Sequence, residues 1–160
     1  MPASRFRMVP LRDTGETYSK IAEHAIAATG TSDATAQNLP KAIPIQGAER
    51  VVLFIEVTAK NHGGGNNVTK INVKYRVSHE EDIPAANSDT GWAFIRADNL
   101  TAASGVSSTK PYTAEITDVT TDFDAGVKLH VLSFPAYGSY ASARIWSDHA
   151  CGIKVSWMRK

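Results

Sequence analysis

Two segments in the middle of the chain alternate apolar and polar side chains with a period of two residues. Over residues 50–60 and 68–78 the apolar members are Val51, Leu53, Ile55 and Val57, followed by Ile71, Val73, Tyr75 and Val77. Because successive side chains of a β-strand point to opposite faces, this alternation predicts two antiparallel strands that are each buried on one side. Such strands must cover their apolar faces, which directs the chain towards a layered sheet protein.

Turn residues separate further strand-like segments after residue 90. These are residues 92–97, 112–120, 127–134, 140–146 and 153–158. Residues 61–67 fit a wide hairpin connection between the first two strands, and residues 147–152 fit a turn between the last two. About seven or eight strands at this spacing, with no long helix between them, predict an all-β fold, an antiparallel β-sandwich of jelly-roll type.

The first 47 residues differ in composition from the rest. The chain has 3 Trp, 5 Tyr and 5 Phe, and of these only Phe6 and Tyr18 precede Phe54. Since aromatic side chains supply much of the buried area of a core, we expect the core to begin near residue 48. We therefore predict an N-terminal arm over residues 1–47 and a β-sandwich domain over residues 48–160.

Two interpretations of the arm stay open. Residues 13–16 fit a capping box, Ile21 and Ala28 share one helical face, and Gly30 fits a helix end, which predicts a short helix over residues 14–29. The alternative is an extended arm that lies across another surface. Just before the domain, an edge strand is predicted from the apolar residues Leu39, Ile43 and Ile45.

Composition excludes several classes of function. The 17 Lys and Arg residues balance the 16 Asp and Glu residues to a net charge of +1, which argues against a dedicated nucleic-acid-binding protein. Residues 51–55 form the longest apolar run, far short of the roughly 20 residues of a membrane span. The N-terminus shows no apolar signal-peptide region, so we expect synthesis in a cytosol and no membrane partner.

Residues with catalytic or metal-binding chemistry are present but poorly arranged. None of the five histidines pair at chelating spacing; they are His24, His62, His79, His130 and His149. Ser147, Asp148 and His149 are adjacent, and neighbouring side chains point apart rather than converging as a triad does. Cys151, the single cysteine, excludes an internal disulfide; it could form a dyad with His149, or it is a small buried residue.

Two other groups of residues are compatible with ligand binding, one with Ca²⁺ and one with a sugar. Acidic residues fall in two loops, at 80–82 and at Asp118, Asp122 and Asp124, where oxygen ligands for Ca²⁺ could gather, although the EF-hand spacing is missing. Sugar-binding aromatics could come from Trp92, Trp146, Trp157, Tyr137 and Tyr140. Of these, Tyr137 and Tyr140 flank a turn and are expected to be exposed. We assign no catalytic, cofactor-binding or metal-binding residue and expect no enzymatic activity.

The beginning of the arm is basic and partly apolar. Arg5, Arg7 and Arg12 all precede the first acidic residue, Asp13. Apolar side chains lie between them, namely Phe6, Met8, Val9 and Leu11. Because free tails are usually poor in apolar residues, we predict that this segment grips an acidic partner surface; the alternative is a frayed terminus.

Several segments together resemble a known class of proteins. Residues 44–58 read Pro-Ile-Gln-Gly-Ala-Glu-Arg-Val-Val-Leu-Phe-Ile-Glu-Val-Thr, residues 91–94 Gly-Trp-Ala-Phe, and residues 153–157 Ile-Lys-Val-Ser-Trp. Over roughly residues 40–158 the chain is similar to small β-sandwich virion proteins of tailed bacteriophages, of the kind that decorate or cement the head shell. The resemblance implies a non-enzymatic structural role, a homo-oligomer, often a trimer, and docking onto the major capsid protein. It also implies a location in the virion after assembly in the host cytoplasm. The alternatives are a tail or head–tail connector component, or a carbohydrate- or protein-binding module.

Overall fold

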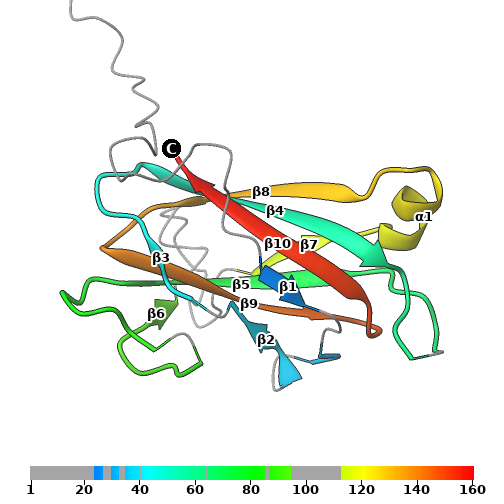
Figure 1. The fold of residues 1–160 in the computed structure, drawn as a ribbon, viewed down its shortest axis with the longest axis horizontal. Coiled ribbons are helices and arrows are strands. Elements are labelled where there is room, and N and C mark those ends of the chain that lie inside the picture. The colour runs from blue at the N-terminus through cyan, green and yellow to red at the C-terminus, as the bar shows by residue number, and fades with distance from the viewer. Residues whose placement is uncertain are drawn as a thin grey trace, which may run out of the picture.

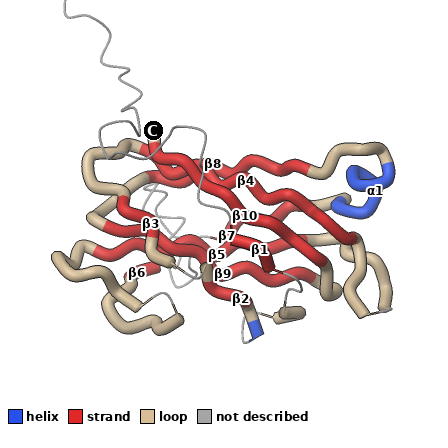
Figure 2. The backbone as a smooth tube through the Cα atoms, viewed as in Figure 1, coloured by secondary structure: helices blue, strands red, loops and turns tan. Residues whose placement is uncertain are grey.

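The computed structural model is built from strands that form two antiparallel sheets. It describes residues 24–26, 30–32, 35–39, 41–63, 65–85, 87–94 and 113–160. Ten strands and one short helix occur in these ranges (Figures 1 and 2). The all-β prediction is confirmed.

The first sheet has the strand order β1-β10-β4-β8. Its members are β1 (His24–Ile26), β10 (Gly152–Arg159), β4 (Arg50–Ala59) and β8 (Leu129–Pro135). All neighbours are antiparallel, and the pairing between β4 and β8 is continuous over their shared length. Since β1 has only three residues, β8 is the longer of the two edge strands.

The second sheet is centred on β5 (Ile71–Ser78) and β9 (Tyr140–Ser147), which pair along their whole length. On the far side of β9 lie two short strands, β2 (Gln37–Asn38) and β3 (Ile43–Pro44). On the far side of β5 lie β6 (Ala93–Phe94) and β7 (Thr113–Ile116), one near each end of β5. Both edges of this sheet are therefore made of short pieces.

The inner faces of the two sheets contribute to a single hydrophobic core. The apolar positions of both alternating segments are buried, from Val51 to Val57 and from Ile71 to Val77. The ring of Tyr75 on β5 stacks on Phe134 of β8, with 4.5 Å between centroids and 7° between planes. In Figure 1, β4 and β8 accordingly lie in one layer, and β5 and β9 in the other.

Most predicted strands occur close to their expected bounds. The segments 50–60, 68–78, 127–134, 140–146 and 153–158 correspond to β4, β5, β8, β9 and β10. The segment 112–120 is only partly a strand, because β7 ends at Ile116 and helix α1 (Val119–Asp124) follows. Asp118, with φ of 58°, makes the change of direction. Of the segment 92–97, residues 93–94 form β6 and residues 95–97 lie outside the described residues.

The predicted hairpin at residues 61–67 is wrong. This segment connects β4 in the first sheet with β5 in the second, so it crosses between layers. Each of the two strands buries one apolar face, and those faces meet across the core rather than lying side by side in one sheet. The turn at residues 147–152 likewise joins β9 of the second sheet to β10 of the first.

Part of the predicted arm belongs to the sheets. The edge strand expected around Leu39, Ile43 and Ile45 is present as β2 and β3, and these three side chains are fully buried. Residues 24–26 form β1 against β10, so the extended interpretation holds for them and the helix does not. The rest of the predicted helix, 14–23 and 27–29, lies outside the described residues, as do residues 1–13. The predicted boundary near residue 47 therefore does not separate the arm from the sheets, because β1, β2 and β3 precede it.

Candidate functional site

The adjacent Ser147, Asp148 and His149 serve a turn and form no triad. The hydroxyl of Ser147 donates to the carbonyl oxygen of His149 at 2.5 Å. The carboxylate of Asp148 instead faces the start of β5. Cys151 is fully buried, with Sγ 3.7 Å from Oγ of Ser147, which agrees with its interpretation as a small core residue. The Ser147 and Asp148 side chains therefore point to different partners, as expected from their adjacency.

Asp148 ties the β4–β5 connection to the β9–β10 turn. Its Oδ1 accepts hydrogen bonds from the backbone N–H groups of Thr69 at 2.9 Å and Lys70 at 3.0 Å. Its Oδ2 accepts one from the Thr69 hydroxyl at 2.5 Å. Burial acts to raise the pKa of Asp148, but these hydrogen bonds outweigh it and hold the pKa below its ordinary value. The carboxylate is a structural anchor at this end of the molecule.

The other titratable residues are dispersed. Within the described ranges, no three His, Cys, Asp or Glu side chains are grouped closely enough to hold a metal ion. Of the acids proposed for Ca²⁺, Asp124 forms an ion pair with Lys60 at 2.7 Å, and Asp118 accepts a hydrogen bond from Thr117. His62 and His79 are exposed, and His130 and His149 are half-buried.

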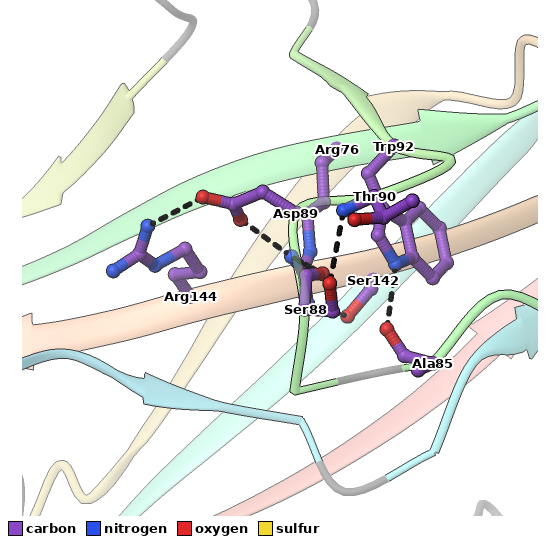
Figure 3. Close-up of polar contacts among 8 residues, drawn as sticks. All are labelled: Arg76, Ala85, Ser88, Asp89, Thr90, Trp92, Ser142 and Arg144. Atoms are coloured by element: carbon purple, nitrogen blue, oxygen red, sulfur yellow. Dashed lines mark hydrogen bonds and ion pairs between the residues drawn. The ribbon is translucent and has the colours of Figure 1, made fainter.

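A buried arginine holds the loop between β5 and β6 against the outer face of the second sheet. Arg76 is 0% exposed, and its Nη1 donates to the carbonyl oxygen of Ser88 at 2.7 Å and to Oδ1 of Asp89 at 2.9 Å. Its guanidinium also lies 4.9 Å from the ring centroid of Trp92. Arg144 approaches the same Asp89 carboxylate at 3.5 Å (Figure 3). The sequence places Arg76 on the polar side of β5 and gives no sign that a loop covers it.

Burial and charge oppose each other at Arg76. Burial lowers the pKa of this guanidinium, the nearby Asp89 carboxylate raises it, and Arg144 lowers it. An arginine stays charged in proteins, so the group needs its anion and its carbonyl acceptor to remain inside. The indole N–H of Trp92 donates to the carbonyl oxygen of Ala85 at 2.9 Å, closing the loop on itself. The contacts of Arg76 and Trp92 together hold the loop of residues 79–92 in place.

The aromatic residues considered for sugar binding differ in burial. Trp146 and Tyr140 are half-buried, so Tyr140 is less exposed than expected. Trp92 and Trp157 are buried, and Trp157 belongs to the core as predicted. Tyr137 is 55% exposed, as expected for its turn. An open hollow of about 280 Å³ is lined by Pro44, Gln46, Glu81, Ser139 and Tyr140.

The most distinctive surface is the outer face of the first sheet. The register aligns Phe54 with Val131, Val52 with Ser133 and Met158, and Glu56 with Leu129. Leu129 and Val131 are 52% and 56% exposed, while Val52, Phe54 and Met158 are half-buried. We call these five residues the apolar outer face: Val52, Phe54, Leu129, Val131 and Met158. A face turned to solvent ordinarily carries polar side chains, so this arrangement is typical of a contact surface.

Sequence reasoning missed this surface although a signal was present. Val52 and Phe54 interrupt the polar side of the alternation over residues 50–60. Apolar residues also occupy every second position at Val127, Leu129 and Val131, on the opposite side of the strand from the buried Phe134. Apolar residues on both sides of a strand indicate a sheet with a second contact surface opposite the core. Only the pairing of β4 with β8 shows that the outward-facing apolar residues of these two strands lie on the same face.

Comparison with protein-family models, with curated proteins and with solved structures finds no match to this chain. Among the described helices, none combines the length and the apolar character that crossing a bilayer requires.

Proposed function

We propose that the chain is a non-enzymatic structural protein of a virion, specifically a decoration or cement protein that binds the major capsid shell of a tailed bacteriophage. The observation that carries this proposal is the apolar outer face, which lies on the same sheet as β1, the first described strand. We take the two sheets to form a β-sandwich of jelly-roll type. The resemblance of the sequence to head-decorating virion proteins supports the choice of shell.

The body has the rigidity that such a role needs. The loop over residues 79–92 is held by a buried guanidinium, and the β4–β5 connection is held by Asp148. A decoration protein must remain folded while it bears load between shell subunits. Loops that are bonded at several points open less readily to proteases than free loops.

The basic N-terminal segment fits the same proposal. Ordering a segment on a partner costs about 1–2 kcal/mol per residue, so the segment must bury apolar area to offset this cost. Burial returns roughly 25 cal/mol per Å². Phe6, Met8, Val9 and Leu11 supply apolar area, and Arg5, Arg7 and Arg12 supply attraction to an acidic shell surface.

The test uses heads of the phage that encodes the chain, prepared from a strain in which its gene is deleted. We expect the purified full-length chain to cosediment with these heads saturably. Replacing residues 1–12 with a Gly/Ser segment of equal length is expected to weaken binding at least about tenfold and to leave the melting temperature unchanged. Absence of binding to heads contradicts the proposal, as does a variant that melts earlier but binds normally.

The same test distinguishes two alternative functions. Binding to tails or to head–tail connectors, and not to heads, assigns the chain to that part of the virion. The second alternative is a carbohydrate-binding module, which the hollow lined by Tyr140 favours, because it combines an aromatic ring with carboxylate, amide and hydroxyl groups. Its volume suits a single sugar residue. Retention on a polysaccharide column that is lost on Tyr140→Ala, with no binding to heads, establishes that alternative.

A further inference from the structure

The edge of β8 differs from every other sheet edge in the described part of the chain. The other edge strands, β1, β2, β3, β6 and β7, have two to four residues, whereas β8 has seven. Natural proteins protect edges with short strands, bulges, lysine or proline, because an open edge pairs with other chains. β8 contains no lysine, its one proline is the last residue, Pro135, and the β4–β8 register shows no shift. The outer edge of β8 therefore offers a regular template for another strand.

We propose that β8 pairs antiparallel with β8 of a second copy of this chain about a two-fold axis through Val131. Each edge then pairs with the backbone of the other, the Ser133 carbonyl also keeping its hydrogen bond from Arg50, and the two first sheets become one continuous sheet. Because paired residues share a face, the exposed Val131 side chains meet each other, and each Leu129 lies opposite Ser133 of the other copy. The inference rests on the β8 edge and on two charged residues of β4, and it holds whether or not the chain binds a capsid.

Charge identifies the second copy as the occupant. Arg50 leans from β4 over β8, where its Nε donates to Oγ of Ser133 at 2.6 Å and its Nη2 to the Ser133 carbonyl at 3.0 Å. Glu56 lies on β4 at the opposite end, directly beside Leu129. The two-fold pairing sets Ser133 against Leu129 of the other copy, so each Arg50 faces the second copy's Glu56.

The spacing permits this contact. Neighbouring strands lie about 4.8 Å apart, so the two β4 strands are roughly 14 Å apart across the seam. An extended arginine and a glutamate side chain together bridge that distance. Two such pairs flank the Val131 contact, one on each side of the axis. An unrelated strand would satisfy the backbone edge but has no reason to match both charges in this register.

The first experiment measures the mass of the full-length chain by sedimentation equilibrium. We expect a dimer, twice the 17.2 kDa of one chain, whereas the resemblance to decoration proteins implies a trimer. Val131→Lys sets two like charges at the axis and should raise the dissociation constant at least about tenfold. Ile83→Lys, at a loop residue that is 70% exposed, is the matched control and should leave the dimer intact. A monomeric or trimeric wild type overturns the proposal.

Two further variants test the register. Arg50→Glu should weaken the dimer, and adding Glu56→Arg should restore it. Val131→Cys should form a disulfide-linked dimer under mild oxidation, because antiparallel partners at an axis have Cα atoms within disulfide range and the natural Cys151 is fully buried. Ile83→Cys is the control for random collision. Failure of the charge exchange to restore association, or equal cross-linking of both cysteine variants, contradicts this pairing.

Discussion

At the scale of single residues, polar groups do the work of holding loops. The apolar side chains of both sheets form an ordinary hydrophobic core. The distinctive residues of this chain are the buried Arg76 and Asp148, whose carboxylate accepts hydrogen bonds from backbone N–H groups. Arg76 and Asp148 each fasten one connection, at opposite ends of β5. A buried charge without its partner is expensive, so each anchor can be tested by removing a single group.

The first prediction concerns the Asp89 carboxylate. Asp89→Ala removes the carboxylate that pairs with the buried Arg76 guanidinium at 2.9 Å, and we expect the free energy of unfolding to fall by about 1–3 kcal/mol. The expected loss of stability is modest because the Asp89 side chain is 60% exposed, so solvent screens its charge. Adding Arg76→Met should recover part of the loss, which urea denaturation of the double-mutant cycle measures.

The matched control for this cycle is Asp124→Ala. Asp124 also pairs with a cation, Lys60, but both partners are substantially exposed, so the loss should stay below about 1 kcal/mol. Equal losses for Asp89→Ala and Asp124→Ala would show that the buried guanidinium does not depend on its anion.

The second prediction concerns acid stability at Asp148. The folded-state pKa of this carboxyl lies below its ordinary value of 3.8, so the stability it supplies is complete above that pH. This stability is lost as the pH falls below 3.8 through the lowered folded-state pKa. Asp148→Asn should reduce the free energy of unfolding at pH 7 by about 1–2 kcal/mol, because an amide nitrogen cannot accept from the Thr69 hydroxyl.

The difference between wild type and Asp148→Asn should shrink as the pH falls below 3.8 through the lowered folded-state pKa, because the wild-type carboxyl then takes up its proton. Urea denaturation at several pH values measures it. Asp82→Asn, at an exposed loop carboxylate, serves as the control. A difference that stays constant down to pH 2 contradicts the role given to the carboxylate charge.

At the scale of elements, strand positions follow from local patterns but strand partners do not. The alternation of Val51 to Val57 and of Ile71 to Val77 depends only on neighbouring residues, and it located β4 and β5 closely. Whether residues 61–67 close a hairpin or cross between sheets depends on the pairing of β4 with β8 and β10 and of β5 with β9, strands that come much later in the chain. The loop over Arg76 and the apolar outer face likewise arise from long-range pairing, so the sequence predicted no site there.

The third prediction tests the β8–β9 connection. Gly138 has φ of 116°, and a Cβ atom there would lie 2.5 Å from the carbonyl oxygen of Ser78. Gly138→Ala must therefore displace backbone and should lower the free energy of unfolding by about 3 kcal/mol or more. Gly126→Ala is the control, since Gly126 also has positive φ, 88°, but opens to free space. It should cost only about 1–2 kcal/mol, so similar thermal shifts for the two variants would contradict this account.

At the scale of the whole molecule, the body is larger than aromatic content indicates. The aromatic residues predicted a core starting near residue 48, because rings dominate buried area. The structure adds the aliphatic residues Leu39, Ile43 and Ile45, each fully buried against the second sheet. Short edge strands with few aromatic residues thus complete the core, and compositional bias alone does not show them.

The fourth prediction follows from this larger body. Deleting residues 1–12 removes no described strand and should leave the melting temperature within a few degrees of wild type. Deleting residues 1–47 removes β1, β2 and β3 and three buried aliphatic side chains. Losing a buried leucine or isoleucine costs about 2–5 kcal/mol, and three such losses reach the 5–15 kcal/mol that stabilises a typical domain. The 48–160 fragment should therefore fail to show cooperative unfolding in circular dichroism and urea denaturation, while the 13–160 fragment retains it. A cooperatively folded 48–160 fragment would mean that the strands before residue 48 are attached to a core that does not need them.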